Sequence, residues 1–164
     1  MTLRLILTRH AKSSWDDPRQ RDFDRPLNSR GRAAATAIGR WLRMEEIIPD
    51  EIISSSAART LETAVRLGFD LEIGSSERLY HAPPDRMLDV LKIATGKTVL
   101  MIGHNPGIAE MAHMLVPKAP KHARFLDYPT GATLIAKFNI DSWDKVQFGQ
   151  ATAEKFIIPA DLAE

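Results

Sequence analysis

The sequence predicts an α/β fold, a three-layer α/β/α sandwich around a mostly parallel sheet with an antiparallel edge. Short aliphatic and β-branched runs alternate with segments of helical periodicity up to about residue 116. This alternation is typical of parallel strands joined by helices. The runs are largely apolar, as expected of strands covered on both faces. The last two runs, residues 133–140 and 145–158, predict a final antiparallel pair.

The first third of the chain contains two predicted strands with one helix between them. Residues 3–8 form an apolar run that predicts the first strand, and residues 11–27 are polar and broken by prolines, which predicts a surface loop. A helix capped by Asn28 or Ser29 follows, and its apolar residues recur on one face. These residues are Ala34, Ala37, Ile38, Trp41 and Leu42. Residues 51–54 predict the second strand.

The middle of the chain repeats the alternation of helix and strand. Ser55 or Ser56 is expected to cap a second helix that ends before Gly68, and residues 71–73 predict a short strand. The third predicted helix has a buried face made of Met87, Leu88, Leu91 and Ala94. Residues 98–102 give the clearest buried strand, which turns into a fourth helix. The buried face of that helix comprises Ile108, Met111, Ala112 and Leu115.

The composition is that of a folded globular protein. With 164 residues, 44% hydrophobic and 26% charged, residues 1–164 are expected to form a single domain. A net charge of +1 gives no basis for a broad nucleic-acid surface, and the absence of cysteine excludes disulfides and thiolate catalysis. The apolar start is too short for a membrane span and lacks the features of a signal peptide. We therefore expect a cytoplasmic monomer with no membrane or nucleic-acid partner.

Two arginines and two histidines follow the predicted strands. Arg9 and His10 come directly after the first strand, Arg59 follows the second, and His104 follows the strand at 98–102. In open α/β sheets, ligands bind outside the carboxyl ends of the strands. The four side chains are therefore expected to converge at one edge of the sheet.

The predicted site contains no acidic residue and suits a phosphoryl group. Arginine presents a planar fork of donors that fits phosphate oxygens, and a neutral imidazole is a good nucleophile toward phosphorus. We expect His10 to attack in its neutral form, while Arg9, Arg59 and a protonated His104 neutralise the phosphoryl charge. The helix that begins near Asn105 would add N–H donors. No metal ion or cofactor is expected.

Three segments resemble those of the histidine phosphatase superfamily, also called phosphoglycerate mutase-like. Residues 8–13 resemble its Arg-His-Gly signature, residues 55–64 are similar to its second arginine segment, and residues 103–107 look like the loop of its second histidine. The matches occur in the order of the family. The short chain looks most like the small branch typified by the SixA phosphohistidine phosphatase.

The resemblance implies a phosphoglycerate mutase-like fold and a mechanism in which His10 becomes phosphorylated. It implies a phosphate pocket formed by Arg9, Arg59 and His104. The N–H groups of Thr130 and Gly131, before a late strand, are expected to close this pocket. The full set of predicted substrate-binding residues is Arg9, Ser13, Asp16, Arg59, His104, Asn105, Thr130 and Gly131.

Three positions depart from the family pattern. Ala11 replaces the usual glycine, which indicates that this turn needs no positive φ. Asp16 stands where many relatives have asparagine, so an ionised side chain there is expected to turn outward or to pair with an arginine. Relatives that act on alkyl phosphates place a glutamate general acid in the segment that aligns with residues 79–81, where this chain has His81. His81 is therefore our candidate proton donor.

The missing glutamate bears on the substrate. An alkoxide leaving group needs a proton, whereas the imidazole of a phosphohistidine needs less help. A phosphorylated protein carrying phosphohistidine is therefore the predicted substrate, and the short loop at 11–27 is consistent with a shallow mouth. A small phosphorylated substrate, hydrolysed or transferred as in a mutase, is one alternative. A module that only binds phosphorylated protein is the other.

Two further features of the sequence have an ordinary and a functional interpretation. Lys118, Lys121, His122 and Arg124 form a small basic run near prolines. A solvated loop is the favoured interpretation, and a docking patch for an acidic partner protein is the alternative. Trp15 lies in a polar loop beside the predicted site, where it could gate entry.

Overall fold

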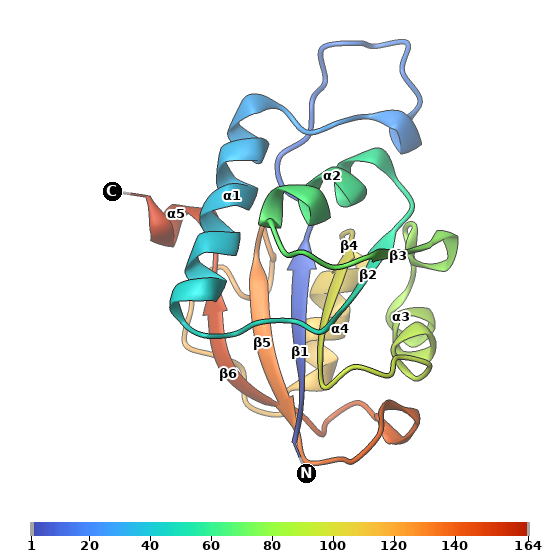
Figure 1. Cartoon of the computed structure of the whole chain (residues 1–164), viewed down its shortest axis with the longest axis vertical. Coiled ribbons are helices and arrows are strands. Elements are labelled where there is room, and N and C mark those ends of the chain that lie inside the picture. Colours follow the sequence, from blue (N-terminus) through green and yellow to red (C-terminus); the bar gives the residue numbers. More distant parts are fainter. Residues whose placement is uncertain (1, 164) are drawn as a thin grey trace.

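A six-stranded sheet lies between two layers of helices in the computed structural model, which describes residues 2–163 (Figure 1). The strands stand in the order β3-β2-β4-β1-β5-β6. β1 to β4 are parallel, and β5 runs antiparallel to its neighbours β1 and β6, so the predicted fold class is confirmed. The strands are β1 (Leu3–Arg9), β2 (Glu51–Ser55), β3 (Ile73–Ser76), β4 (Thr98–Gly103), β5 (Thr133–Phe138) and β6 (Thr152–Ile157).

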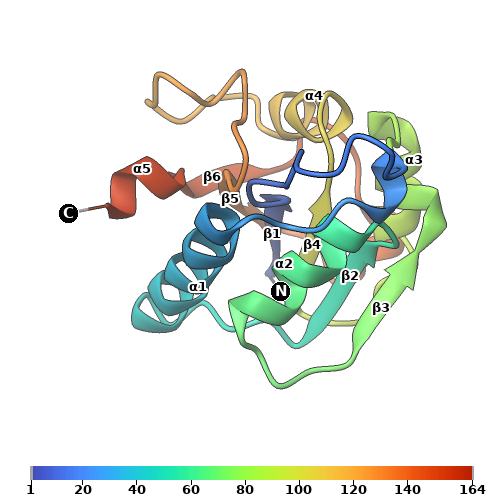
Figure 2. The same ribbon diagram turned by 90° about the horizontal axis from the view of Figure 1, so that it is seen from above.

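Helices cover both faces of the sheet, as the view from above shows (Figure 2). One layer contains α1 (Ser29–Met44) and α2 (Ala58–Leu67), and the other contains α3 (Pro84–Leu91) and α4 (Gly107–Leu115). A short C-terminal helix packs against α1. The remaining elements are α5 (Pro159–Leu162) and the 3₁₀ turns η1 (Asp22–Asp24), η2 (Glu77–Leu79) and η3 (Trp143–Lys145).

The alternation of side chains along β1 builds both halves of the core. Leu5 and Leu7 belong to the apolar cluster beneath α3 and α4, whereas Ile6 belongs to the cluster beneath α1 and α2. Because successive residues of a strand point to opposite faces, one apolar run supplies both layers. The close crossing of α1 and α2 requires Gly39, where a Cβ atom would lie 2.0 Å from the carbonyl oxygen of Leu67.

The structure corrects several predicted boundaries. Asn28 caps α1, since its side chain accepts a hydrogen bond from the N–H of Gly31 at 2.8 Å. Neither Ser55 nor Ser56 is the N-cap of α2; Ala57 holds that position without a side-chain cap, because β2 continues through Ser55.

The other differences lie on the outer strands and at the C-terminus. The strand expected at 71–73 is β3, which occupies 73–76, and the last strand begins at Thr152 because η3 and a turn precede it. Helix α5 was not expected. Among residues 2–163, no helix has both the length and the hydropathy needed to span a membrane.

Candidate active site

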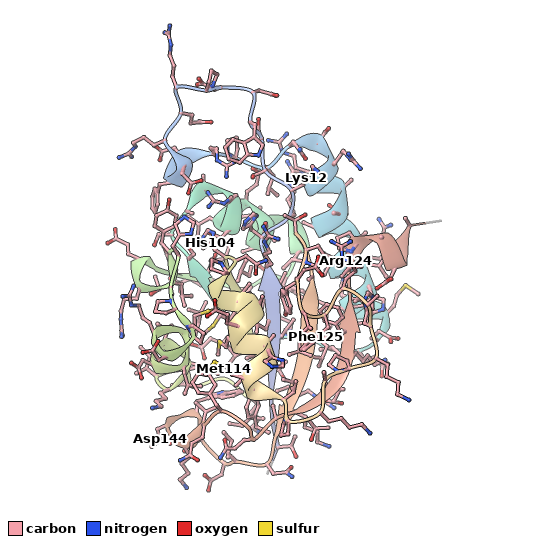
Figure 3. All side chains as sticks on the ribbon, turned by 180° about the vertical axis from the view of Figure 1, so that it is seen from behind. Lys12, His104, Met114, Arg124, Phe125 and Asp144 are labelled. Carbon is pink, nitrogen blue, oxygen red and sulfur yellow. The ribbon has the colours of Figure 1, made fainter. Side chains whose placement is uncertain are left out.

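The register between β1 and β4 brings the two predicted histidines together. Arg9, the last residue of β1, pairs with Gly103, the last residue of β4, so His10 and His104 leave the sheet side by side. Their ring centroids are 5.4 Å apart. Both rings are buried. Figure 3 shows His104 toward the end of the molecule at which β1 ends. The convergence expected at the carboxyl edge of the sheet is therefore present.

A hydrogen bond to the main chain orients the His10 ring. Nδ1 donates to the carbonyl oxygen of Ala11 at 2.7 Å, since a carbonyl can only accept. The neutral ring therefore carries its lone pair on Nε2, which has no hydrogen-bond partner among residues 2–163. Burial and the positive charges of Arg9 and Arg59 lower the pKa of His10 to about 3. His10 is thus neutral at pH 7, with one nucleophilic nitrogen at the cavity.

The His104 ring is held between two groups that fix its tautomer. Arg59 Nη2 donates to Nδ1 at 3.3 Å, and Nε2 donates to the hydroxyl oxygen of Ser55 at 2.8 Å. Burial lowers the pKa of His104, and the neighbouring His10 ring and the positive charge of Arg59 lower it further, to about 2. The expectation of a protonated His104 is therefore wrong for the free protein, because a cation at this buried position would face a guanidinium group.

The two arginines keep buried donors without partners. Arg9 Nη1 donates to the carbonyl oxygen of Tyr128 at 3.2 Å, whereas Arg9 Nε and Arg59 Nε are buried and unpaired within residues 2–163. Arg59 is only 2% exposed, and it reaches the cavity from the first turn of α2, just beyond the end of β2. A buried donor left unpaired costs free energy, so both groups favour the arrival of an acceptor-rich ligand.

Asp22 is the main residue that the sequence analysis missed, and it contradicts the expectation of a site without acidic groups. Its carbonyl oxygen accepts from Arg59 Nη1 at 2.7 Å, and Oδ2 accepts from Arg59 Nη2 at 3.0 Å. Oδ2 also accepts from the Tyr80 hydroxyl at 2.5 Å and lies 3.1 Å from His81 Nε2. Burial alone would raise the pKa of Asp22, but these hydrogen bonds outweigh it and hold the pKa well below the usual range. Asp22 is therefore a carboxylate.

Arg25 fixes the loop that carries Asp22. Its guanidinium donates to Asp22 Oδ1 at 3.0 Å and to the Ser13 hydroxyl at 2.9 Å. The same guanidinium lies under the indole of Trp15, 3.5 Å from the ring centroid, and the other face of Trp15 is exposed. Trp15 therefore stands at the mouth of the cavity on a rigid support. Neither Asp22 nor Arg25 follows a strand, so strand-end reasoning could not identify them.

The remaining predicted residues divide into two groups. Ser13, His81, Asn105 and Thr130 line the cavity. Asp16 is exposed and does not line it, and Gly131 donates its N–H to the carbonyl oxygens of Arg9 and His10, so neither supplies a group to an anion. Ala11 does not have a positive φ, which confirms that its turn needs no glycine.

The cavity has a volume of about 310 Å³ and a wall rich in cations. Within residues 2–163, no group of three or more His, Asp or Glu side chains is arranged to hold a metal ion. A dianion in the cavity would meet three guanidinium groups and the single carboxylate of Asp22. The residues that line the cavity are Arg9, His10, Lys12, Ser13, Trp15, Asp22, Arg25, Arg59, His81, His104, Asn105 and Thr130.

Comparison with known proteins agrees with this geometry. Residues 5–82 match the model of the histidine phosphatase superfamily, branch 1. An uncharacterised protein of Mycobacterium tuberculosis is 30% identical over 158 residues, which cover 92% of this chain and 99% of that protein. The chain belongs to the histidine phosphatase superfamily. A 2,3-bisphosphoglycerate-dependent phosphoglycerate mutase of Bifidobacterium longum is also 30% identical, but over 82 residues that span 49% of this chain and 31% of the mutase.

Solved structures of SixA proteins share the fold over nearly the whole chain. A protein assigned as the phosphohistidine phosphatase SixA of Nakamurella multipartitia has a TM-score of 0.86 at 27% identity, and covers 97% of both chains. The protein histidine phosphatase SixA in complex with tungstate has a TM-score of 0.81 and covers 98% of this chain. At 18% identity, the second likeness shows the fold alone. Superfamily membership and the likeness to the 27% identical SixA protein support phosphatase activity.

Proposed function

We propose that this protein is a metal-independent phosphatase that removes phosphoryl groups from phosphohistidine on a protein substrate through a phosphorylated His10. One observation carries the proposal. In the part of the chain that the structure describes, Nε2 of neutral His10 is unpaired and stands in a cavity where Arg9 and Arg59 keep buried, unpaired Nε donors. A nucleophile surrounded by preorganised donors suits in-line attack on phosphorus, because the donors neutralise charge on the non-bridging oxygens.

The first step transfers the phosphoryl group to the enzyme. His10 Nε2 attacks phosphorus, a new P–N bond forms, and the P–N bond to the substrate imidazole breaks. The electron pair of the broken bond stays on the substrate nitrogen, which takes up a proton from water or from His81. Arg9 and Arg59 hold the phosphoryl oxygens through this step. The carbonyl oxygen of Ala11 keeps Nδ1–H in place, so the imidazolium that forms is stabilised.

The second step releases the phosphate. Water attacks phosphorus on the face opposite His10 Nε2, its proton leaves to solvent, and the P–Nε2 bond breaks. His10 regains its lone pair and inorganic phosphate departs. Burial of the ring favours this return to the neutral form, because a buried cation is costly.

The chemistry of the leaving group favours phosphohistidine over alkyl phosphates. The carboxylate that lies in the cavity, Asp22, has a pKa held below its usual range by hydrogen bonds, so it carries no proton to give to an alkoxide. His81 faces Asp22 through Nε2 and is half exposed. An imidazole leaving group tolerates this lack of a strong acid. The likeness to SixA proteins supports the same substrate class.

Trapping of the intermediate tests the mechanism. The protein is mixed with a ³²P-phosphohistidine peptide and quenched in alkali, where phosphohistidine survives. We expect the wild type to carry label that is lost in His10→Ala, with His113→Ala, an exposed histidine of α4, as the control that still labels. Label retained in His10→Ala would contradict the assignment. A wild type that binds the peptide and never labels would favour a binding module.

A substrate panel separates the phosphohistidine phosphatase from its nearest rival. The partial match to a phosphoglycerate mutase makes phosphoglycerates the proper comparison. We expect kcat/KM for a phosphohistidine peptide to exceed that for 3-phosphoglycerate and for glucose 6-phosphate by at least about 100-fold, since alkoxide leaving groups lack a proton donor. Equal or higher values for a phosphoglycerate would replace the proposed substrate with a small molecule.

Metal chelation tests the source of positive charge. In the proposed mechanism the guanidinium groups of Arg9, Arg59 and Arg25 supply all the charge that a bound Mg²⁺ supplies in other phosphotransferases. Turnover in excess EDTA is expected to match turnover in buffer within a factor of about two. Loss of activity that returns on addition of Mg²⁺ or Zn²⁺ would overturn this part of the mechanism.

A further inference from the structure

A second cavity opens directly beside the active site. Its volume is about 350 Å³, and it shares two wall residues, Lys12 and Thr130, with the phosphate cavity. Beyond these two residues it runs between the first turns of α1 and the segment that leads into α5. We call this cavity the basic groove, and its walls include Lys12, Arg30, Ala34, Arg124, Pro129 and Pro159.

The groove carries positive charge on its rim. Lys12 and Arg30 are exposed and have no ion-pair partner among residues 2–163, whereas Arg124 is bound to Asp127 at 2.8 Å. Among residues 2–163, no Asp or Glu lines the groove. Figure 3 shows Lys12 and Arg124 on the same side of the molecule. Since the whole chain has a net charge of only +1, this local excess of cations is a specific feature and not a general property of the surface.

The floor of the groove is apolar. Ala34 lies one turn beyond Arg30 on α1, and Pro129 and Pro159 approach from the other side. Pro159 also packs close to Gly131, whose φ of +78° lets the chain turn under it. The prolines restrict their backbone and keep the floor in place. The groove therefore combines a fixed apolar floor with charges on long, mobile side chains.

We propose that the basic groove binds an acidic segment that flanks the phosphohistidine of a protein substrate. The proposal rests on the phosphatase function proposed above and extends it to the partner. Because Lys12 and Thr130 belong to both cavities, a chain whose phosphorylated side chain enters the phosphate cavity meets the groove within a few residues.

The build of the groove favours a protein segment over a small molecule with a second phosphate. A second phosphate calls for buried, converging donors like those around His10. The three basic residues here are exposed instead, which suits separate carboxylates spread along a peptide. The apolar floor suits the aliphatic parts of the intervening side chains. The basic run of the sequence contributes Arg124 alone to this surface.

The test compares two phosphohistidine peptides of equal length, one with Asp and Glu on both sides of the histidine and one with Ser at those positions. Phosphoimidazole serves as a small substrate that cannot reach the groove. Arg30→Gln removes one charge, and Ala34→Glu places a carboxylate on the floor. Arg40→Gln is the matched control, since Arg40 is an exposed arginine on the same helix, more than two turns away.

We expect Arg30→Gln to lower kcat/KM for the acidic peptide about fivefold and Ala34→Glu to lower it more. Phosphoimidazole hydrolysis should stay unchanged in both variants, and Arg40→Gln should behave as wild type. The advantage of the acidic peptide over the Ser peptide should shrink as salt rises. Equal kcat/KM for the two peptides, or an equal effect of Arg30→Gln on phosphoimidazole, would overturn the proposal.

A binding arm keeps this proposal separate from the proposed function. The unphosphorylated acidic peptide, labelled with a fluorophore, is titrated with each variant and the Kd is read from anisotropy. Weaker binding in Arg30→Gln and Ala34→Glu alone would support the groove even if no phosphohistidine were hydrolysed. Binding that is the same in all four proteins would refute the groove, whatever the turnover. A preference for a small bisphosphate over the acidic peptide would assign the groove to a second phosphate instead.

Discussion

Two regions of different construction meet at the candidate active site. The proposed reactive groups, His10, Arg59 and His104, are all buried. The two histidines follow the paired ends of β1 and β4, and Arg59 lies in the first turn of α2. The loop at 11–27 supplies Asp22 and Trp15, which remain partly or mostly exposed and are held by side-chain hydrogen bonds and stacking. The proposed bond-making groups thus stand on the buried edge of the sheet and the start of α2, which we call the frame. The groups that tune charge and access stand on the loop.

The loop also changes the state of the frame. Asp22 accepts two hydrogen bonds from Arg59, so part of the guanidinium fork is already used in the free protein. The carboxylate keeps Arg59 in one orientation and offsets its charge. It would also repel an incoming dianion. The frame therefore raises the affinity of the site for an anion and the loop lowers it, whereas both help to orient Arg59.

Removal of a frame residue is expected to have the largest effect. Arg59→Ala should lower kcat/KM by roughly 10²–10³, because one preorganised donor to the transition state is lost. Arg66→Ala on the same helix is the control, since Arg66 is exposed and its contact with Glu62 is long, at 3.9 Å. Steady-state kinetics, with thermal unfolding to check the fold, measures both. A loss of kcat/KM below about tenfold in Arg59→Ala would mean that the frame contributes less than the loop to stabilisation of the transition state.

The residues of the frame could be predicted from the sequence because local patterns show where each strand ends. Apolar runs end at Arg9 and at Gly103, and parallel strands end at one edge, so convergence follows without knowledge of side-chain contacts. Asp22 could not be predicted in this way. It lies in a polar segment among other acidic residues, and its role depends on Tyr80 and Arg59, more than thirty residues away in sequence.

The bounds of the outer strands could not be predicted accurately for a related reason. β3 begins two residues later than expected, and the long last run is a strand only over 152–157, because tertiary pairing and a turn at Gly149 set these limits. Within the site, the role of Gly131 was mispredicted for the same reason. Its position before a strand suggested a free N–H, but the carbonyl oxygens of Arg9 and His10 take that donor.

The pH dependence of stability should separate the two regions. Folding lowers the pKa of His10 to about 3 and that of His104 to about 2, both from 6.5. Between pH 6.5 and 3 the unfolded chain binds more protons than the folded one, so the free energy of unfolding falls as the pH falls. Each histidine contributes a slope of at most about 1.4 kcal/mol per pH unit. Asp22 contributes stability that is lost only below its usual pKa of 3.8.

Urea unfolding at pH 6.5, 5.5 and 4.5 isolates the histidines, since all three values lie above 3.8. We expect a decline of a few kcal/mol in the wild type and about half of that decline in His104→Gln, which keeps the polar contacts without the titration. His113→Gln, on an exposed face of α4, should keep the wild-type decline. A His104→Gln protein that declines as steeply as wild type would show that the buried ring does not resist protonation.

The smallest effect is expected from the loop, and it has the opposite sign. Asp22→Asn removes the carboxylate from the cavity but keeps an oxygen that can accept from Tyr80 and the main-chain carbonyl that binds Arg59. Inorganic phosphate should then inhibit about tenfold more strongly, since one repulsive charge near the anion is gone and such a pair interacts by about 1–3 kcal/mol at an effective dielectric of about 20. Asp24→Asn, in the same turn and paired with Arg21, is the matched control. Competitive inhibition by phosphate measures the change. Unchanged inhibition would mean that Asp22 serves only to orient Arg59, and the opposition between loop and frame would then be one of geometry and not of charge.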